Sequence, residues 1–147
     1  MNYKNELREL FNIFNETDKI YNELAHCVGL NHNQLNILYY IETHKNVTQK
    51  NITDDLLIPK QTVNTILSNW IKENLITFEN ENSKKYKIIL FTEAGKNELL
   101  PKVYYVMNKE AQILERLDIK QIDELIVSNA NYLKIMKEVI NDGKQNG

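Results

Sequence analysis

The chain has 147 residues, enough for one well-buried domain or for a compact domain with extensions that pair with a second chain. Hydrophobic residues make up 42% and charged residues 26%, a composition that excludes a disordered chain and a membrane protein. The N-terminus, MNYKNELREL, has acidic residues and lacks the apolar stretch of a signal peptide. We therefore expect a cytoplasmic protein with no membrane partner, and the single cysteine fits a reducing compartment.

The formal net charge of −2 does not by itself indicate a nucleic-acid-binding protein. The charges are unevenly distributed, however, because lysines outnumber acidic residues between Lys45 and Leu90 and acidic residues dominate elsewhere. This asymmetry is modest, but it favours an anionic partner for the middle of the chain.

Apolar residues at helical spacing predict a first helix that ends at Gly29. A second helix is expected to begin at Asn31, which forms a capping pair with Gln34. Thr48 is the expected N-cap of a third helix, and Pro59 suits the first turn of a fourth.

The fourth helix is expected to end near Asn74, because asparagine tolerates the left-handed conformation common at helix ends. Two strands are predicted at about residues 75–79 and 85–91. A long helix then spans residues 93–117 with an expected kink at Pro101, and a capping pair of Asp118 and Gln121 opens a final helix.

This order of elements predicts a mainly α fold with a small β-hairpin wing (α+β), within a single domain of residues 1–147. Residues 30–95 would form a winged helix-turn-helix, whose second helix can lie in a DNA major groove. Residues 1–29 and 96–142 would form dimerisation helices, because their apolar faces are too large for a small winged-helix core to cover.

Three segments carry a resemblance to a known family: NQLNILYYI at 33–41, PKQTVNTILSNWIKENLI at 59–76 and LFTEAG at 90–95. In this order and spacing the chain resembles the multiple-antibiotic-resistance regulator (MarR) family of bacterial transcription factors over nearly its whole length. The resemblance implies a homodimer with paired winged helices. It also implies a ligand cleft between the dimerisation and DNA-binding parts, for a small aromatic or phenolic effector.

The wing differs from the usual pattern of that family, in which an Asp-Arg-Arg-like cluster reaches the minor groove. Ser83, Lys84 and Lys85 stand at the corresponding positions. The two arginines, Arg8 and Arg116, lie outside the winged helix, so bidentate recognition of guanine by arginine is not available there.

Polar side chains on the fourth helix point instead to A·T-rich DNA, because glutamine and asparagine can pair with adenine and a threonine methyl can pack on thymine. Lysines would contact phosphates. The alternative is an ordinary solvated polar face. The residues assigned to DNA binding are Lys50, Lys60, Gln61, Thr62, Asn64, Thr65, Ser68, Lys84, Lys85 and Lys87.

Other candidate sites are weaker. Tyr39 or Tyr40 could line the implied ligand cleft, since such clefts are often lined by aromatic side chains. Cys27 could sense oxidants, but a lone cysteine is more often a small buried hydrophobic residue. His26, Cys27 and the two other histidines lack metal-ligand spacing, so we expect neither a metal nor another cofactor.

No catalytic constellation is present in the sequence, and we do not expect an enzyme. We expect a sequence-specific double-stranded DNA-binding regulator, a repressor that binds a palindromic A·T-rich operator as a homodimer and is released by a small-molecule effector. The alternative is a winged-helix dimer that binds little DNA and acts as a protein-interaction or antirepressor module.

Overall fold

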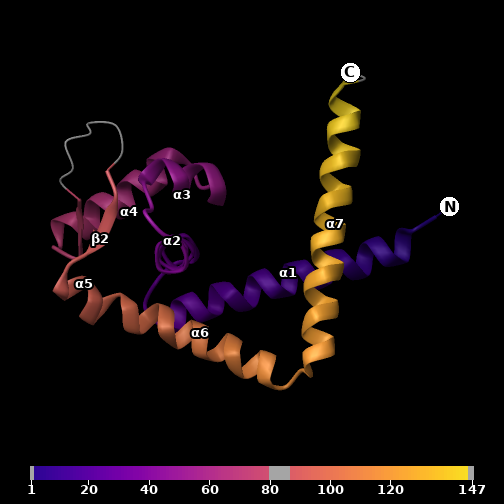
Figure 1. Cartoon of the computed structure of the whole chain (residues 1–147), viewed down its shortest axis with the longest axis horizontal. Coiled ribbons are helices and arrows are strands. Elements are labelled where there is room, and N and C mark those ends of the chain that lie inside the picture. The colour runs from indigo at the N-terminus through magenta and orange to yellow at the C-terminus, as the bar shows by residue number, and fades with distance from the viewer. Residues whose placement is uncertain (1, 80–86, 146–147) are drawn as a thin grey trace. The chain divides into compact units, whose positions relative to one another are not determined.

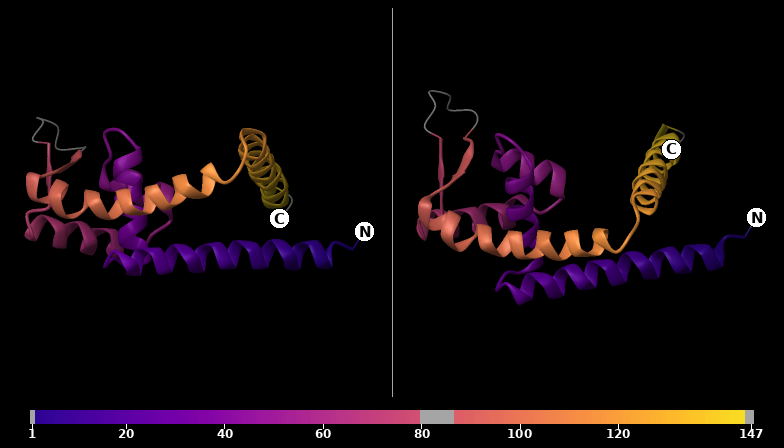
Figure 2. Two further views of the ribbon diagram at one scale, coloured as in Figure 1. Left: turned by 90° about the horizontal axis from the view of Figure 1, so that it is seen from below. Right: turned by 60° about the horizontal axis from the view of Figure 1, so that its bottom comes forward.

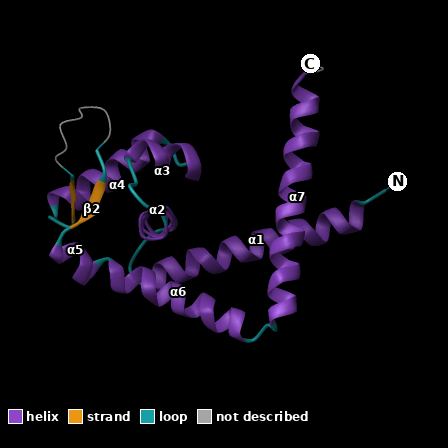
Figure 3. Ribbon diagram, viewed as in Figure 1, coloured by secondary structure: helices purple, strands orange, loops and turns teal. Residues whose placement is uncertain are grey.

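The structure, a computed structural model, describes residues 2–79 and 87–145 (Figure 1). It separates into two compact units, Met1–Met107 and Asn108–Gly147. The described part is mainly helical, with one pair of short strands (Figure 3), which confirms the predicted fold class. The elements are α1 (Lys4–Cys27), α2 (His32–Thr43), α3 (Gln49–Leu56), α4 (Lys60–Lys72), β1 (Ile76–Phe78), β2 (Ile89–Phe91), α5 (Glu93–Glu98), α6 (Leu100–Glu115) and α7 (Ile119–Gln145).

The three predicted caps are confirmed. The Asn31 side chain accepts from the Gln34 backbone at 2.8 Å, and the Gln34 side chain accepts from the Asn31 backbone at 2.9 Å. Thr48 caps α3, and Asp118 and Gln121 exchange the equivalent pair of bonds at the start of α7. These bonds satisfy backbone N–H groups that have no partner within their helix.

The strands form an antiparallel hairpin in which Ile76 pairs with Phe91 and Phe78 with Ile89. Each strand is only three residues long, so both predicted ranges were too wide. The Ile89 N–H donates to the Val47 carbonyl at 2.9 Å, which attaches the hairpin to the loop before α3.

Asn74 adopts the left-handed conformation expected at the end of α4, with φ of 59°. Its carbonyl accepts the Thr92 hydroxyl at 2.6 Å, and the Thr92 N–H donates to the Leu75 carbonyl at 3.1 Å. Thr92 is also the N-cap of α5, where its hydroxyl oxygen accepts from the Gly95 N–H at 3.0 Å. One threonine therefore joins the end of α4, the base of the hairpin and the start of α5.

The predicted long helix after the hairpin is divided at Leu99 into α5 and α6. Pro101 is the second residue of α6, so the interruption lies two residues before the position where a kink was expected. Proline has no N–H to donate to the carbonyl four residues earlier, which accounts for a break at this point.

The core lies within the first unit and is formed by apolar residues of α2, α3, α4, the hairpin and the start of α6. Trp70 of α4 is 4% exposed and belongs to this core. α1 is one uninterrupted helix (Figure 2), and Ala25 is its one buried residue. No helix in the described ranges is both long and apolar enough to cross a bilayer.

Candidate nucleic-acid interface

Two faces of α4 differ sharply in chemistry. Val63, Ile66, Leu67 and Trp70 are buried against the core. The opposite face is polar and carries the α4 residues that the sequence assigned to DNA binding. Thr62 is partly buried, and the others are exposed: Lys60, Gln61, Asn64, Thr65 and Ser68. A helix anchored by one face and polar on the other is suited to lie in a groove of DNA.

The exposed face of α4 continues to a residue that the sequence reasoning missed. Gln61, Thr65, Ser68 and Lys72 follow one another at intervals of four, three and four residues, so they share a stripe along the helix. Lys72 is exposed and is suited to a phosphate at the far end of that stripe. The helical spacing alone could have identified it.

The hydroxyl of Thr65 donates to the Gln61 carbonyl one turn earlier, at 2.9 Å. This bond directs the hydroxyl toward the helix backbone. A methyl at this position can pack on the methyl group of thymine.

The turn before α4 has an unusual backbone. Leu57 has φ of 52°, and its side chain is 88% exposed. Pro59 is the N-cap of α4, with φ of −52°, and makes no side-chain cap bond. It therefore lies immediately before the helix, whereas the sequence had predicted it in the first turn. The first N–H groups of α4 therefore receive no cap from that side chain and are placed to donate hydrogen bonds to a phosphate oxygen.

The helix before the turn, α3, carries one of the predicted phosphate contacts. Lys50 forms an ion pair with Asp54, one turn further along the same helix. Both side chains are largely exposed, so water screens the pair and it is worth little in stability. Its consequence is local, since the carboxylate cancels the charge that Lys50 would present to DNA.

In the hairpin, Lys87 is exposed and its ammonium lies 5.5 Å from the centre of the Phe78 ring. This cation–π contact holds the charge beside the last residue of β1. Lys84 and Lys85, which the sequence assigned to the wing, lie outside the described residues.

Tyr40 is 9% exposed, and its hydroxyl donates to the carboxylate of Asp55, which joins α2 to α3. This bond, with burial, raises the pKa of Tyr40 to about 12. The imidazole of His44 stacks on the Tyr40 ring with 3.9 Å between the centroids. The neighbouring Tyr39 packs, partly buried, against the core. A role of either tyrosine in a ligand cleft stays a prediction.

A second tyrosine–carboxylate bond joins α2 to the first part of α6. The Tyr104 hydroxyl donates to the Glu42 carboxylate at 2.7 Å, which raises the pKa of Tyr104. Close by in the sequence, Lys102 donates to the Val28 carbonyl at 3.0 Å, beyond the end of α1. α2 is thus connected through polar side chains to both the helix-turn-helix and α6.

Cys27 is exposed, not buried as a lone cysteine more often is. Within residues 2–79 and 87–145, no cluster of three or more histidine, cysteine or acidic side chains could hold a metal ion. Oxidant sensing by Cys27 stays a prediction.

The family model and several of the solved structures that match this chain carry the same family name. A family model described as MarR family matches residues 28–85, which include α2, α3, α4 and β1. No curated protein matches the sequence.

Solved structures with the same fold cover nearly the whole chain. A MarR family regulator from Neisseria meningitidis is 23% identical, with a TM-score of 0.80 over 97% of this chain and 99% of that one. MarR from Staphylococcus aureus in complex with salicylate and kanamycin is 22% identical, with a TM-score of 0.68 over 92% of this chain and 95% of that one. A mutant of MepR from Staphylococcus aureus bound to an oligodeoxyribonucleotide is 19% identical, with a TM-score of 0.52 over 90% and 97%.

The matched segment contains the helix-turn-helix whose polar and buried faces are described above, and the fold is shared from α1 to α7. Residues 28–85 thus match the MarR family model, and the chain shares the fold of the MarR family regulator from Neisseria meningitidis over nearly its whole length.

Proposed function

We propose that this protein is a homodimeric transcriptional repressor that binds a palindromic, A·T-rich operator through α4. The observation that carries the proposal is the division of α4 into a buried apolar face and an exposed face rich in amide and hydroxyl side chains. Two copies of such a helix, one turn of DNA apart, match a palindrome.

The chemistry of the exposed face supports the A·T preference. Gln61 and Asn64 can each form two hydrogen bonds with the edge of adenine in the major groove, and the Thr65 methyl can contact thymine. Lys60 and Lys72 lie near opposite ends of α4 and can contact phosphates on the two sides of the groove. The MepR structure bound to an oligodeoxyribonucleotide supports the same use of the fold.

Release by a small aromatic effector is the remaining part of the proposal. The related MarR from Staphylococcus aureus was solved with salicylate. In this chain Tyr39 and Tyr40 are the candidates for contact with an effector, and the Tyr40 hydroxyl is bonded to Asp55.

Binding of the full chain to duplexes selected from a random pool tests the proposal. We expect selected sites to be A·T-rich palindromes, with affinity that falls at least about a thousandfold between 50 and 200 mM salt as counterions are released. Absence of binding even at low salt would contradict the proposal and favour the protein-interaction module.

Substitutions in α4 distinguish base-specific contacts from sequence-independent electrostatic binding to DNA. Gln61→Ala and Asn64→Ala should each cost about 1–3 kcal/mol on the selected site and relax the preference at one position of each half-site. Asn97→Ala in α5 is the matched control, because Asn97 is an exposed asparagine outside α4. If all three variants bind like the wild type, α4 does not read the bases.

A further inference from the structure

The turn between α3 and α4 contains a leucine that is unfavourable for the fold in both its backbone and its side chain. Leu57 adopts the left-handed conformation, with φ of 52° and ψ of 28°, in which the Cβ atom of an ordinary residue is crowded by the backbone. Its side chain is 88% exposed, the largest exposed fraction of any large apolar residue in the described ranges. Leu57 therefore gains little from burial that could offset its strain.

The residues on either side of Leu57 behave differently. Leu56 packs, partly buried, against the core, and Ile58 is 6% exposed. The turn thus needs apolar side chains at both neighbours, but at Leu57 itself glycine or asparagine would give the same backbone with less strain. Strained residues that the fold does not need concentrate at functional sites, so the Leu57 side chain is expected to contact something outside this chain.

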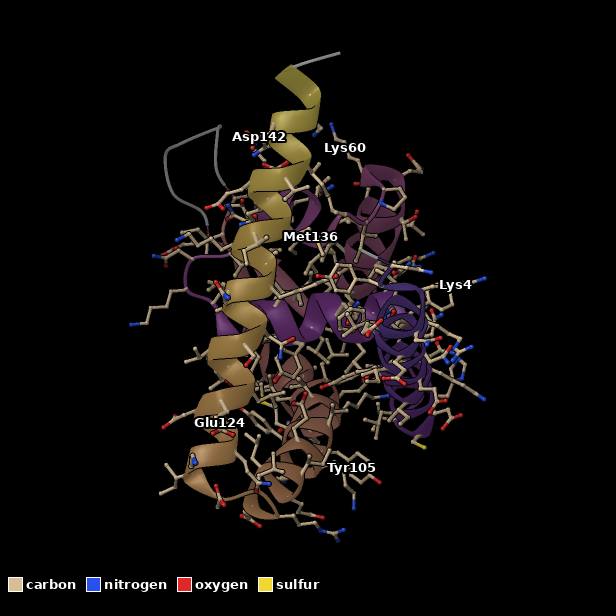
Figure 4. The ribbon with its side chains drawn as sticks, turned by 90° about the vertical axis from the view of Figure 1, so that its right-hand side faces the viewer. Lys4, Lys60, Tyr105, Glu124, Met136 and Asp142 are labelled. Carbon is tan, nitrogen blue, oxygen red and sulfur yellow. The ribbon has the colours of Figure 1, made fainter. Side chains whose placement is uncertain are left out.

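The residues that follow Leu57 favour a nucleic acid as that partner. Lys60 begins α4, and its exposed side chain extends away from the ribbon (Figure 4). Because Pro59 supplies no side-chain cap, the first N–H groups of α4 can donate to a phosphate at the same end of the helix. An anionic ligand would therefore be attracted to the turn that presents Leu57.

Two acidic residues precede the turn, and both are bound by other side chains. Asp54 forms the ion pair with Lys50, so a positive charge offsets its carboxylate. Asp55 accepts the hydroxyl of Tyr40, which holds this carboxylate toward α2. These contacts reduce the repulsion that the end of α3 would otherwise exert on a phosphate backbone.

The place of the turn in a helix-turn-helix indicates which part of DNA Leu57 can reach. The first helix crosses the DNA backbone, and the N-terminal residues of the second helix contact base edges in the major groove. The turn that joins them lies where the backbone borders the groove. The apolar group that the bases present in this groove is the methyl group of thymine.

From these features we infer that Leu57 is a specificity-determining residue whose side chain packs on the methyl group of a thymine in the operator. The inference rests on the proposed function and adds a base contact from the turn to those of the exposed face of α4. The contact uses an apolar side chain that the fold leaves in solvent at the expense of backbone strain.

Operator duplexes in which each thymine is replaced in turn by deoxyuridine test this contact, because the exchange removes only the methyl group. The full-length wild type should lose affinity roughly fourfold at the thymine that Leu57 contacts, the effect expected for one methyl-sized group. Leu57→Asn should bind the unmodified duplex at least about fourfold more weakly and show no further loss at that thymine. Fluorescence anisotropy with labelled duplexes measures both effects.

Leu57→Met is the matched control, because methionine keeps an apolar side chain at the same position. It should retain the wild-type affinity and the response to deoxyuridine. Leu57→Asn is expected to fold, since asparagine tolerates the left-handed conformation, and circular dichroism checks this directly.

The outcomes separate this inference from the proposed function. A wild type that binds no duplex contradicts the proposed function and the inference with it. If the wild type binds but Leu57→Asn responds to every deoxyuridine as the wild type does, only the thymine contact is overturned. A loss of affinity in Leu57→Asn that is the same on thymine and deoxyuridine duplexes would also overturn it, because the side chain would then rest on the sugar and not on a base.

Discussion

Gly95 lies so close to the backbone of Leu75 that a Cβ atom built on it would be 1.8 Å from the Leu75 carbonyl oxygen. That carbonyl accepts the N–H of Thr92, so it cannot turn away without loss of a bond at the base of the hairpin. Replacement of Gly95 by alanine would normally stabilise a helix, but here the steric cost dominates.

We expect Gly95→Ala to lower the free energy of unfolding by about 1–3 kcal/mol or more, the range found for overpacked sites. Chemical denaturation with circular dichroism measures this change. Gly143→Ala is the control, because no atom lies within 4 Å of its Cβ and the helix should gain about 0.5–1 kcal/mol. Equal stability of Gly95→Ala and the wild type would show that the hairpin can shift to make room.

Leu57 is a second site where backbone and side chain conflict. A left-handed leucine costs about 1–2 kcal/mol, and with 88% of its surface exposed the side chain recovers little by burial. Leu57→Asn should therefore raise the free energy of unfolding by up to about 1 kcal/mol, because asparagine tolerates this conformation.

The reverse exchange provides the control for Leu57. Asn74 is exposed and has a similar φ of 59°, so Asn74→Leu should lower stability by a comparable amount. Thermal unfolding of both variants decides the matter. If Leu57→Asn is no more stable than the wild type, the exposed leucine makes contacts in the folded protein that outweigh its strain.

The parts of the fold that the sequence predicted well are those decided by neighbours along the chain. The pairs Asn31–Gln34 and Asp118–Gln121 act across one helical turn, so their spacing was sufficient to predict them. Thr48, the predicted N-cap of the third helix, likewise acts on a residue only three positions further along the chain.

The features that the sequence did not predict depend on approach in space or on a local conflict. The Tyr40–Asp55 bond requires α2 and α3 to meet across fifteen residues of sequence. The left-handed Leu57 contradicts its own conformational preference, so propensity could not reveal it. By contrast, the Lys50–Asp54 pair has helical i,i+4 spacing and could have been predicted.

The Tyr40–Asp55 bond predicts a pH dependence of stability. The pKa of Tyr40 is raised in the folded protein from 10.0 to about 12, so the unfolded chain releases this proton first as pH rises. The stability from the bond is therefore complete below pH 10 and is lost as pH rises toward 12. We expect Tyr40→Phe to cost about 1–2 kcal/mol near neutral pH, and this cost should shrink above pH 10.

Urea denaturation of the two proteins at several pH values between 8 and 11 measures this difference. Tyr3→Phe is the control, because Tyr3 is exposed and precedes α1. A cost of Tyr40→Phe that stays constant with pH would contradict the bond to a charged carboxylate.

Because Asp54 forms an ion pair with Lys50, we expect removal of the Asp54 charge to raise the affinity for DNA. Asp54→Asn abolishes the pair and removes a negative charge from α3, the helix that crosses the DNA backbone in helix-turn-helix proteins. The stability should change by no more than about 0.5 kcal/mol, because the pair is exposed. If the lysine then contacts a phosphate, affinity should rise several-fold and the plot of log affinity against log salt should steepen by about one unit per subunit.

Fluorescence anisotropy with a labelled operator duplex at four or more salt concentrations measures both quantities. Asp18→Asn in α1 is the matched control, since it makes the same change in net charge outside the helix-turn-helix. Equal gains in the two variants would mean that only overall charge matters. An unchanged salt slope in Asp54→Asn would mean that Lys50 does not contact a phosphate, and that contacts to the backbone come from α4 and the wing.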